Sequence, residues 1–171
     1  MALTVETGAG LADADSYVSV AGFKAYCDMQ GLDYAGMTDE AIEIALRRAT
    51  QWIDVTYGPI FKGTWRLTTQ ALEWPRVDVV YRDRVLPYDE IPAKLGAATC
   101  EAAFREAGTT GTLFPDTVPV AVKRDRVGDV ETEFRAGAVQ AGIGPISVID
   151  GYLADLTLGR ASAYFGRSER A

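Results

Sequence analysis

The sequence contains no histidine and no asparagine. Without histidine it offers no Ser-His-Asp or Cys-His pair, no HExxH zinc motif and no imidazole to carry protons near neutral pH. Its two cysteines, Cys27 and Cys100, cannot by themselves complete a four-ligand zinc site. Both fall in helical patterns, so we expect two reduced core thiols in a cytosolic product. We therefore expect no enzyme, no catalytic residue, no metal and no cofactor.

Long apolar runs and nucleotide-binding loops are also missing. No run approaches the ~18 apolar residues that a membrane span needs, so we expect no membrane partner. The glycine-containing segments 8–13 and 142–147 lack the third glycine and the strand–helix context of a dinucleotide loop, and GPIFKGTW does not match a Walker loop.

The composition is that of one globular domain, and its charge is unevenly distributed. The chain has 171 residues, 48% of them hydrophobic, and a net charge of −7. Residues 1–56 hold nine acids and three bases, whereas the last fifteen residues have a basic excess. Proteins that grip DNA through its phosphates usually carry a basic patch. The charge pattern therefore disfavours tight general DNA binding.

Apolar periodicity predicts a mainly α fold, a small bundle of about four helices. We expect helices over residues 19–30, 38–57 and 91–108 and from residue 147 onward. Ser19 and either Thr38 or Asp39 are the expected N-caps, Gly31 is a C-cap, and Asp150 stands at the capping-box offset from Ser147. The expected buried face of the second helix is Ala41, Ile42, Ala45, Leu46, Ala49, Trp52 and Ile53, and that of the fourth includes Val148.

Between the helices, residues 119–135 read as a β-hairpin centred on Gly128-Asp129, with Phe134 on one face of the second strand. An isolated hairpin is marginal in water, so this one must pack on the helices or on a neighbouring subunit. Residues 77–86 fit either a short strand or an exposed loop. The predicted organisation is a helical domain over 1–156 with this hairpin inserted, followed by a tail over 157–171.

Two tryptophans, Trp65 and Trp74, lie in a short segment that is bounded by Gly63 and ended by Pro75. Loops rarely hold bulky aromatics unless a surface has been built to receive them. Two hypotheses remain open for them: packing within the chain under the loop, or anchoring an interface between subunits.

The last fifteen residues combine small residues with three arginines and an aromatic pair. One interpretation is a solvated tail. The other is a segment that becomes ordered on a partner, with the aromatic pair as its anchor and arginines paired with carboxylates. Its candidate partner-binding residues are Arg160, Tyr164, Phe165 and Arg167.

Five motifs occur in a fixed order: DSYVSVAGFKAYCDMQG, ALRRATQWID, FKGTW, QALEWPR and IPAKLGAATCEAA. Together they resemble a family of small tailed-phage proteins often labelled DnaT-like single-stranded-DNA-binding proteins. That family is similar in architecture to the head–tail connector, or adaptor, proteins of long-tailed phages. The resemblance covers about residues 4 to 156 and brings no catalytic residues with it.

The connector resemblance implies a structural virion protein that forms a homo-oligomeric ring, commonly of twelve subunits, beneath the portal. Its implied partners are the portal protein and a further neck or tail-terminator protein. Genome DNA would pass through the lumen without specific binding, which acidic walls favour. The implied location is the head–tail neck of the virion, after synthesis in the cytoplasm of the host bacterium.

The alternative, from the family label, is a single-stranded-DNA-binding accessory protein of replication. It requires aromatics beside basic residues, as Trp65 stands beside Lys62 and Arg66. A third hypothesis, a carboxylate-dependent enzyme, would need a pocket with converging acids.

Overall fold

The computed structural model describes residues 2–114, 124–127, 130–133 and 146–158. Its helices are α1 (Val20–Gln30), α2 (Asp39–Tyr57), α3 (Ala93–Gly108) and α4 (Ser147–Leu153), and a 3-10 turn, η1 (Gly58–Ile60), continues α2. The strands are β1 (Thr64–Trp65), β2 (Arg76–Val77), β3 (Val80–Tyr81), β4 (Arg84–Val85), β5 (Arg124–Val127) and β6 (Val130–Glu133). The predicted mainly α fold with four helices is confirmed.

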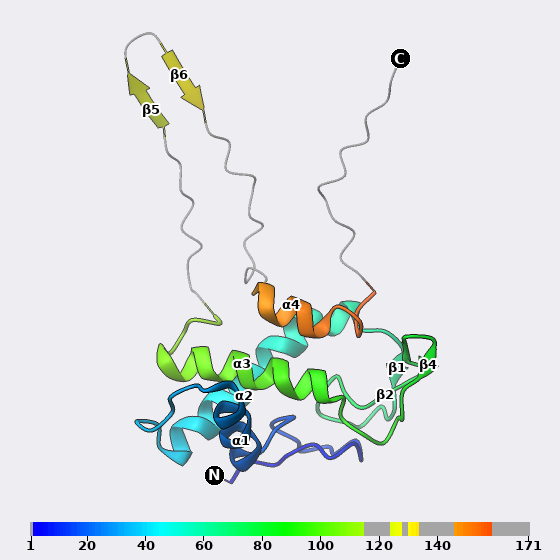
Figure 1. Cartoon of the computed structure of the whole chain (residues 1–171). Coiled ribbons are helices and arrows are strands. Elements are labelled where there is room, and N and C mark those ends of the chain that lie inside the picture. Colours follow the sequence, from blue (N-terminus) through cyan, green and yellow to red (C-terminus); the bar gives the residue numbers. More distant parts are fainter. Residues whose placement is uncertain (1, 115–123, 128–129, 134–145, 159–171) are drawn as a thin grey trace, which may run out of the picture.

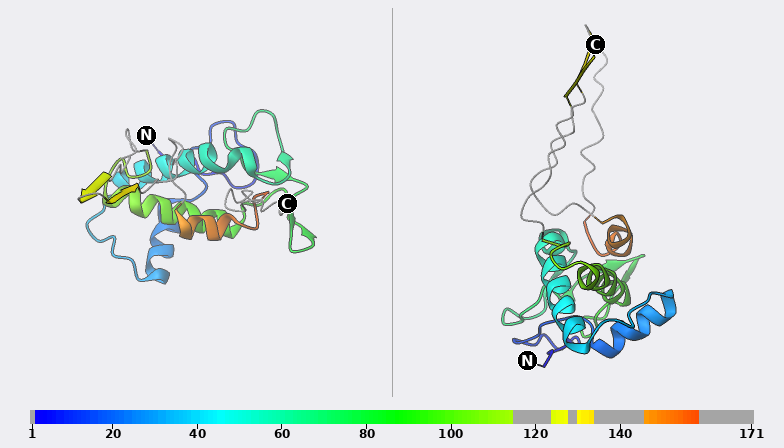
Figure 2. Two further views of the ribbon diagram at one scale, coloured as in Figure 1. Left: turned by 90° about the horizontal axis from the view of Figure 1, so that it is seen from above. Right: turned by 90° about the vertical axis from the view of Figure 1, so that its left-hand side faces the viewer.

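The core lies between α2 and α3, and α3 also contacts α1 and α4. Small side chains on both helices, among them Ala45, Ala49, Ala98 and Ala102, are almost fully buried. They let the two backbones approach closely, while Leu46 and Leu95 fill the space beside them. In Figures 1 and 2, α1 and α4 lie on opposite sides of the α2–α3 pair.

A run of aromatic rings connects the end of α2 to the following loop. Trp52 meets Tyr57 edge to face at 5.8 Å between centroids, Tyr57 lies 6.5 Å from Phe61, and Phe61 meets Trp74 edge to face at 5.7 Å. Edge-to-face contacts match the ring quadrupoles and add to the burial of apolar area. The loop after α2 is thereby fixed to the helical core.

The predicted caps of the first two helices are confirmed. Ser19 Oγ accepts a hydrogen bond from the Gly22 N–H at 3.0 Å, and Thr38 Oγ1 accepts from the Ala41 N–H at 3.2 Å. Gly31 ends α1 with a φ of 67°, in the left-handed region that glycine adopts without steric cost.

Other details differ from the predictions. Ala41 and Val148 are exposed, so neither belongs to the buried face of its helix. The residue preceding α4 is Ile146, with no side-chain cap, and Asp150 instead accepts a hydrogen bond from Tyr57 OH at 2.7 Å. Asp150, which stands at the capping-box offset, therefore joins α4 to α2 through this hydrogen bond. No helix in the described ranges is long and apolar enough to cross a membrane.

The N-terminal segment is shaped by one buried carboxylate. The Glu6 side chain accepts hydrogen bonds from the N–H groups of Gly8, Gly10 and Leu11 at 2.7–2.9 Å. Leu11 in turn accepts a backbone bond from Ala71 at 2.9 Å, so this segment supports the loop that follows β1.

The predicted hairpin is confirmed as the antiparallel pair β5–β6, with Val127 opposite Val130. Within the described part of the chain it contacts no other helix or strand, and it stands apart from the helices in Figure 1. Phe134 lies outside the described residues.

Glu106, near the end of α3, fixes the turn that follows this helix. Its buried carboxylate accepts hydrogen bonds from the N–H groups of Gly111 at 2.8 Å and Leu113 at 3.1 Å, and it pairs with Arg48 from α2. Burial alone would raise the pKa of Glu106, but these donors outweigh it and hold the pKa below its usual value.

We expect Glu106→Gln to lower the free energy of unfolding by about 1–3 kcal/mol at neutral pH, because backbone donors lose a charged acceptor. The pKa of Glu106 is lower in the folded chain than in the unfolded chain. Its ionised carboxylate therefore stabilises the fold fully above the unfolded pKa of about 4.3, and this stabilisation is lost as the pH falls through the folded pKa. Chemical denaturation at pH 7 and at pH 3 checks this. Glu90→Gln, at an exposed site, is the matched control. An equal loss of stability in Glu106→Gln at the two pH values would contradict the role of the ionised Glu106 carboxylate.

Candidate nucleic-acid interface

The loop between α2 and α3 builds two small antiparallel pairs, β1–β2 and β3–β4, at one end of the helical body (Figure 1). Gly63 has a φ of 71°, and a Cβ added there would lie 2.1 Å from the Val77 carbonyl oxygen. Only glycine permits this approach. Between β3 and β4, Arg82 and Asp83 have φ values of 48° and 63°, typical of a two-residue hairpin turn.

The ring of Tyr81, in β3, has two cations near it. The Arg82 guanidinium carbon lies 5.3 Å from the ring centroid, and Lys94 Nζ lies 5.4 Å from it. At these distances a cation is attracted by the aromatic quadrupole. An aromatic side chain and two positive charges therefore meet where β3 approaches the start of α3.

Asp155, just after α4, joins this group. Its carboxylate lies 3.0 Å from Lys94 Nζ and 3.9 Å from Arg82 Nε, and its backbone carbonyl accepts a hydrogen bond from Lys62 Nζ at 2.7 Å. The hydrogen bond from Lys94 is the main cause that lowers the pKa of Asp155. Two cations thus pair with the Asp155 carboxylate, and a third binds the backbone carbonyl of the same residue. We call Lys62, Tyr81, Arg82, Lys94 and Asp155 the Tyr81 cluster.

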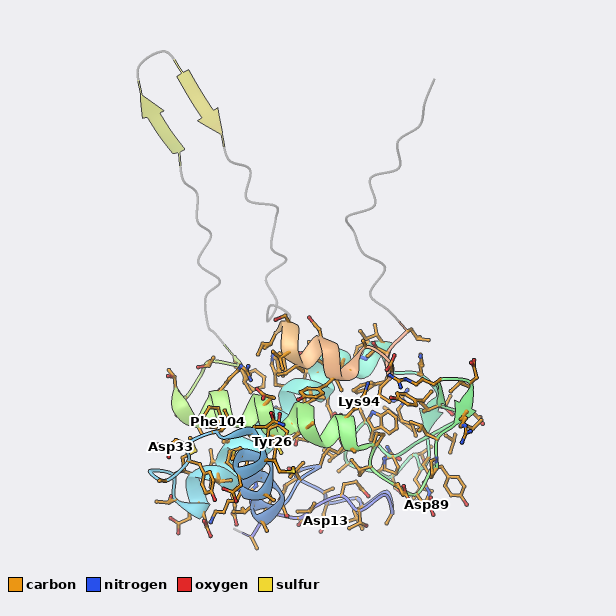
Figure 3. All side chains as sticks on the ribbon, in the orientation of Figure 1. Asp13, Tyr26, Asp33, Asp89, Lys94 and Phe104 are labelled. Carbon is orange, nitrogen blue, oxygen red and sulfur yellow. The ribbon has the colours of Figure 1, made fainter. Side chains whose placement is uncertain are left out.

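A mainly apolar hollow of about 350 Å³ opens beside the Tyr81 cluster. Figure 3 shows Lys94 on the end of α3 that faces the β strands, with Asp89 on the loop leading to it. The residues that line the hollow include Tyr81, Leu86, Pro87, Glu90, Ile91, Lys94 and Leu156. Among the described residues, its lining holds one cation, Lys94, and one carboxylate, Glu90. A planar ring can enter such a hollow while a phosphate meets Lys94.

Trp65 is 53% exposed, and its indole N–H donates to Glu73 Oε2 at 2.7 Å. The neighbouring Arg66 places its guanidinium carbon 5.0 Å from the exposed ring of Tyr88 and donates to the Gly8 carbonyl. A second aromatic and basic group therefore lies on the same loop.

Trp74, in contrast, is fully buried in the core, and its backbone N–H donates to Tyr17 OH at 3.2 Å. The two tryptophans therefore differ in their surroundings: Trp74 packs within the chain, while Trp65 lies on the surface. The other predicted site residues, Phe134, Arg160, Tyr164, Phe165 and Arg167, lie outside the described residues.

An open groove of about 510 Å³ lies on the Trp65 side of this end of the molecule. We call it the Asp54 groove; its lining includes Asp54, Val55, Pro59, Trp65, Glu73 and Arg76. Asp54 accepts hydrogen bonds from Tyr17 OH at 2.5 Å and from the Glu73 N–H at 3.1 Å. Burial raises the pKa of Asp54 to about 7, because these donors only partly offset it.

Neither the Tyr81 cluster nor the Asp54 groove was anticipated from the sequence. The signal for the cluster is the segment VYRDR, in which a tyrosine, two arginines and a turn-forming aspartate alternate. Its other members come from distant positions, and no spacing connects them. Groups of three or more potential metal-ligating side chains are absent from the ranges that the structure describes.

A family model described as "Putative DnaT-like ssDNA binding protein" matches residues 1–171. The chain belongs to this family. The comparisons with curated proteins and with solved structures returned no match.

We expect Gly63→Ala to destabilise the β1–β2 pair. The left-handed backbone alone costs about 1–2 kcal/mol for a residue with a side chain, and the contact with the Val77 carbonyl adds to this. Gly36→Ala is the matched control, because nothing lies within 4 Å of its added Cβ. Urea titration gives the free energy of unfolding of both variants. Equal stability of Gly63→Ala and Gly36→Ala would refute the close approach of Gly63 to the Val77 carbonyl.

Proposed function

We propose that this protein binds single-stranded DNA weakly through the Tyr81 cluster and the hollow beside it. The observation that carries this proposal is the tyrosine ring with two cations near it, set at the rim of an apolar hollow. Single-strand-binding surfaces combine cations that follow the phosphates with aromatic rings on which bases stack. Membership of the family whose description names this activity also supports it.

In this proposal each part of the cluster has a separate role. Lys62, Arg82 and Lys94 hold phosphates, and a base stacks on Tyr81 with its edge in the hollow. The Asp155 carboxylate pairs with Arg82 and Lys94 in the free protein and competes with the phosphate for these two cations. The net charge of −7 opposes DNA elsewhere on the chain, so binding is weak and sensitive to salt.

Fluorescence anisotropy with a labelled oligothymidine tests this proposal. Each phosphate contact contributes about −0.7 to the slope of log K against log salt, so three cations give a slope of about −2. We expect Arg82→Gln with Lys94→Gln to reduce the slope to about −0.7, and Tyr81→Leu to cost about 1–3 kcal/mol by loss of stacking. Lys24→Gln, which removes a cation of α1, is the matched control.

Asp155→Asn gives the sharpest distinction from a purely structural cluster. Removing the competing carboxylate leaves the cations to the phosphate, so we expect tighter binding of the oligothymidine. A structural role predicts unchanged or weaker binding. Absence of binding at low salt in the natural chain would overturn the proposal as a whole.

A second candidate function is that of a head–tail connector subunit in a ring beneath the portal. The observation that favours it is the β5–β6 hairpin, which contacts no other described helix or strand although an isolated hairpin is marginal in water. A neighbouring subunit or a further neck protein would supply the missing contact. In this candidate, Arg160, Tyr164, Phe165 and Arg167 bind the portal protein.

Negative-stain imaging of the chain, alone and mixed with a portal protein, tests the connector candidate. We expect rings in at least one sample, and deletion of residues 157–171 should weaken portal binding. Monomers in both samples would reject the candidate, and undiminished binding after the deletion would reject the role of the tail.

A further inference from the structure

Within the described part of the chain, no lysine or arginine forms an ion pair with the carboxylate of Asp54, which lines the Asp54 groove. Its two hydrogen-bond donors, Tyr17 OH and the Glu73 N–H, are both neutral. The guanidinium of Arg76 lines the same groove, but it pairs with the Glu73 carboxylate at 2.8 Å and donates to the carbonyls of Lys62 and Gly63. A cation entering the groove would therefore meet an available carboxylate.

The walls of the groove suit an aromatic as well as a cationic group. Trp65 and Val55 are both more than half exposed, and Pro59 lies between the helix and the loop. An exposed indole face attracts guanidinium groups and packs against aromatic rings. The groove thus fits a peptide that carries arginine and aromatic residues together.

The described part of the chain ends beside this groove. Thr157 forms an antiparallel bridge with Phe61, and the Leu158 N–H donates to the Ile60 carbonyl at 2.8 Å. Because the two segments are antiparallel, Leu158 lies on the Pro59 side of the bridge, and Pro59 lines the groove.

The segment that follows, residues 159–171, has the chemistry that the groove accepts. Its first charged residue is Arg160, two positions after Leu158, and Tyr164-Phe165 follows. It contains a single acid, Glu169. At about 3.3–3.6 Å per extended residue, the segment is long enough to cross the groove from end to end.

We infer that the Asp54 groove is the docking site of segment 159–171 of the same chain. In this arrangement the Arg160 guanidinium pairs with the Asp54 carboxylate, and the aromatic pair of the segment covers Trp65. The inference is independent of DNA binding, because the groove and the hollow at the Tyr81 cluster have no lining residue in common.

The docking is expected to depend on pH. Burial raises the pKa of Asp54, with Tyr17, Glu73 and Arg76 as the other charged or titratable groups that act on it. The ionised form binds the guanidinium, so docking is strong above pH 7 and is lost as the pH falls through the folded pKa of about 7 toward 5. Docking in turn favours ionisation and lowers this pKa.

Acrylamide quenching of tryptophan fluorescence tests the inference on the full chain. Trp52 and Trp74 are fully buried, so the quenchable signal comes from Trp65. We expect deletion of residues 159–171, Arg160→Gln or Asp54→Asn to increase quenching at pH 8. Arg170→Gln is the matched control in the tail, and Trp65→Phe should abolish the difference between the full and the truncated chain.

A synthetic peptide of residues 157–171, added to the chain truncated after Leu158, measures the pairing directly. We expect Arg160→Gln to weaken the peptide about tenfold, or about 1.4 kcal/mol, and binding to weaken from pH 8 to pH 6. Equal quenching of the full and truncated chains, or an equal effect of Arg170→Gln, would overturn the inference. Quenching that increases on dilution would place the segment in the groove of a second copy and also overturn it.

Discussion

Close packing of α2 against α3 is the constraint on which the rest of this structure depends. Alanines on both helices allow the backbones to approach, and α3 then supplies the surface for α1 and α4. Since interiors are packed as densely as organic crystals, a larger side chain at this contact would move every other element. The aromatic rings that begin at Trp52 extend the same packing into the loop after α2.

This loop has no core of its own, and it carries both candidate binding surfaces. The short pairs β1–β2 and β3–β4 would be unstable alone, so Trp74 and Phe61 must hold them on the helices. A rigid attachment at the base leaves the outer side chains free to face a ligand. Function on a loop fixed by a scaffold is a common arrangement in proteins.

The helices could be predicted because each has a local signal. Apolar residues recur at helical spacing, and Ser19, Thr38 and Gly31 cap within their own segments. The Tyr81 cluster could not be predicted, because Lys62, Tyr81, Lys94 and Asp155 come from four separate segments and meet only after α4 has packed on α3. The same holds for Asp54 and Tyr17, thirty-seven positions apart. The strands β1 to β4 have two residues each, which is too short for an alternation of apolar and polar residues from which a strand could be predicted.

The bridge between Phe61 and Thr157 has a mechanical consequence. It joins the end of the described chain to the turn after α2, the longest of the described helices, through the Lys62–Leu156 and Leu158–Ile60 backbone bonds. A force applied to the C-terminal end along the antiparallel pair loads these bonds together, in shear, and passes into α2. A force across the pair opens them one after the other. The direction of pull therefore decides whether the body resists it or releases the end.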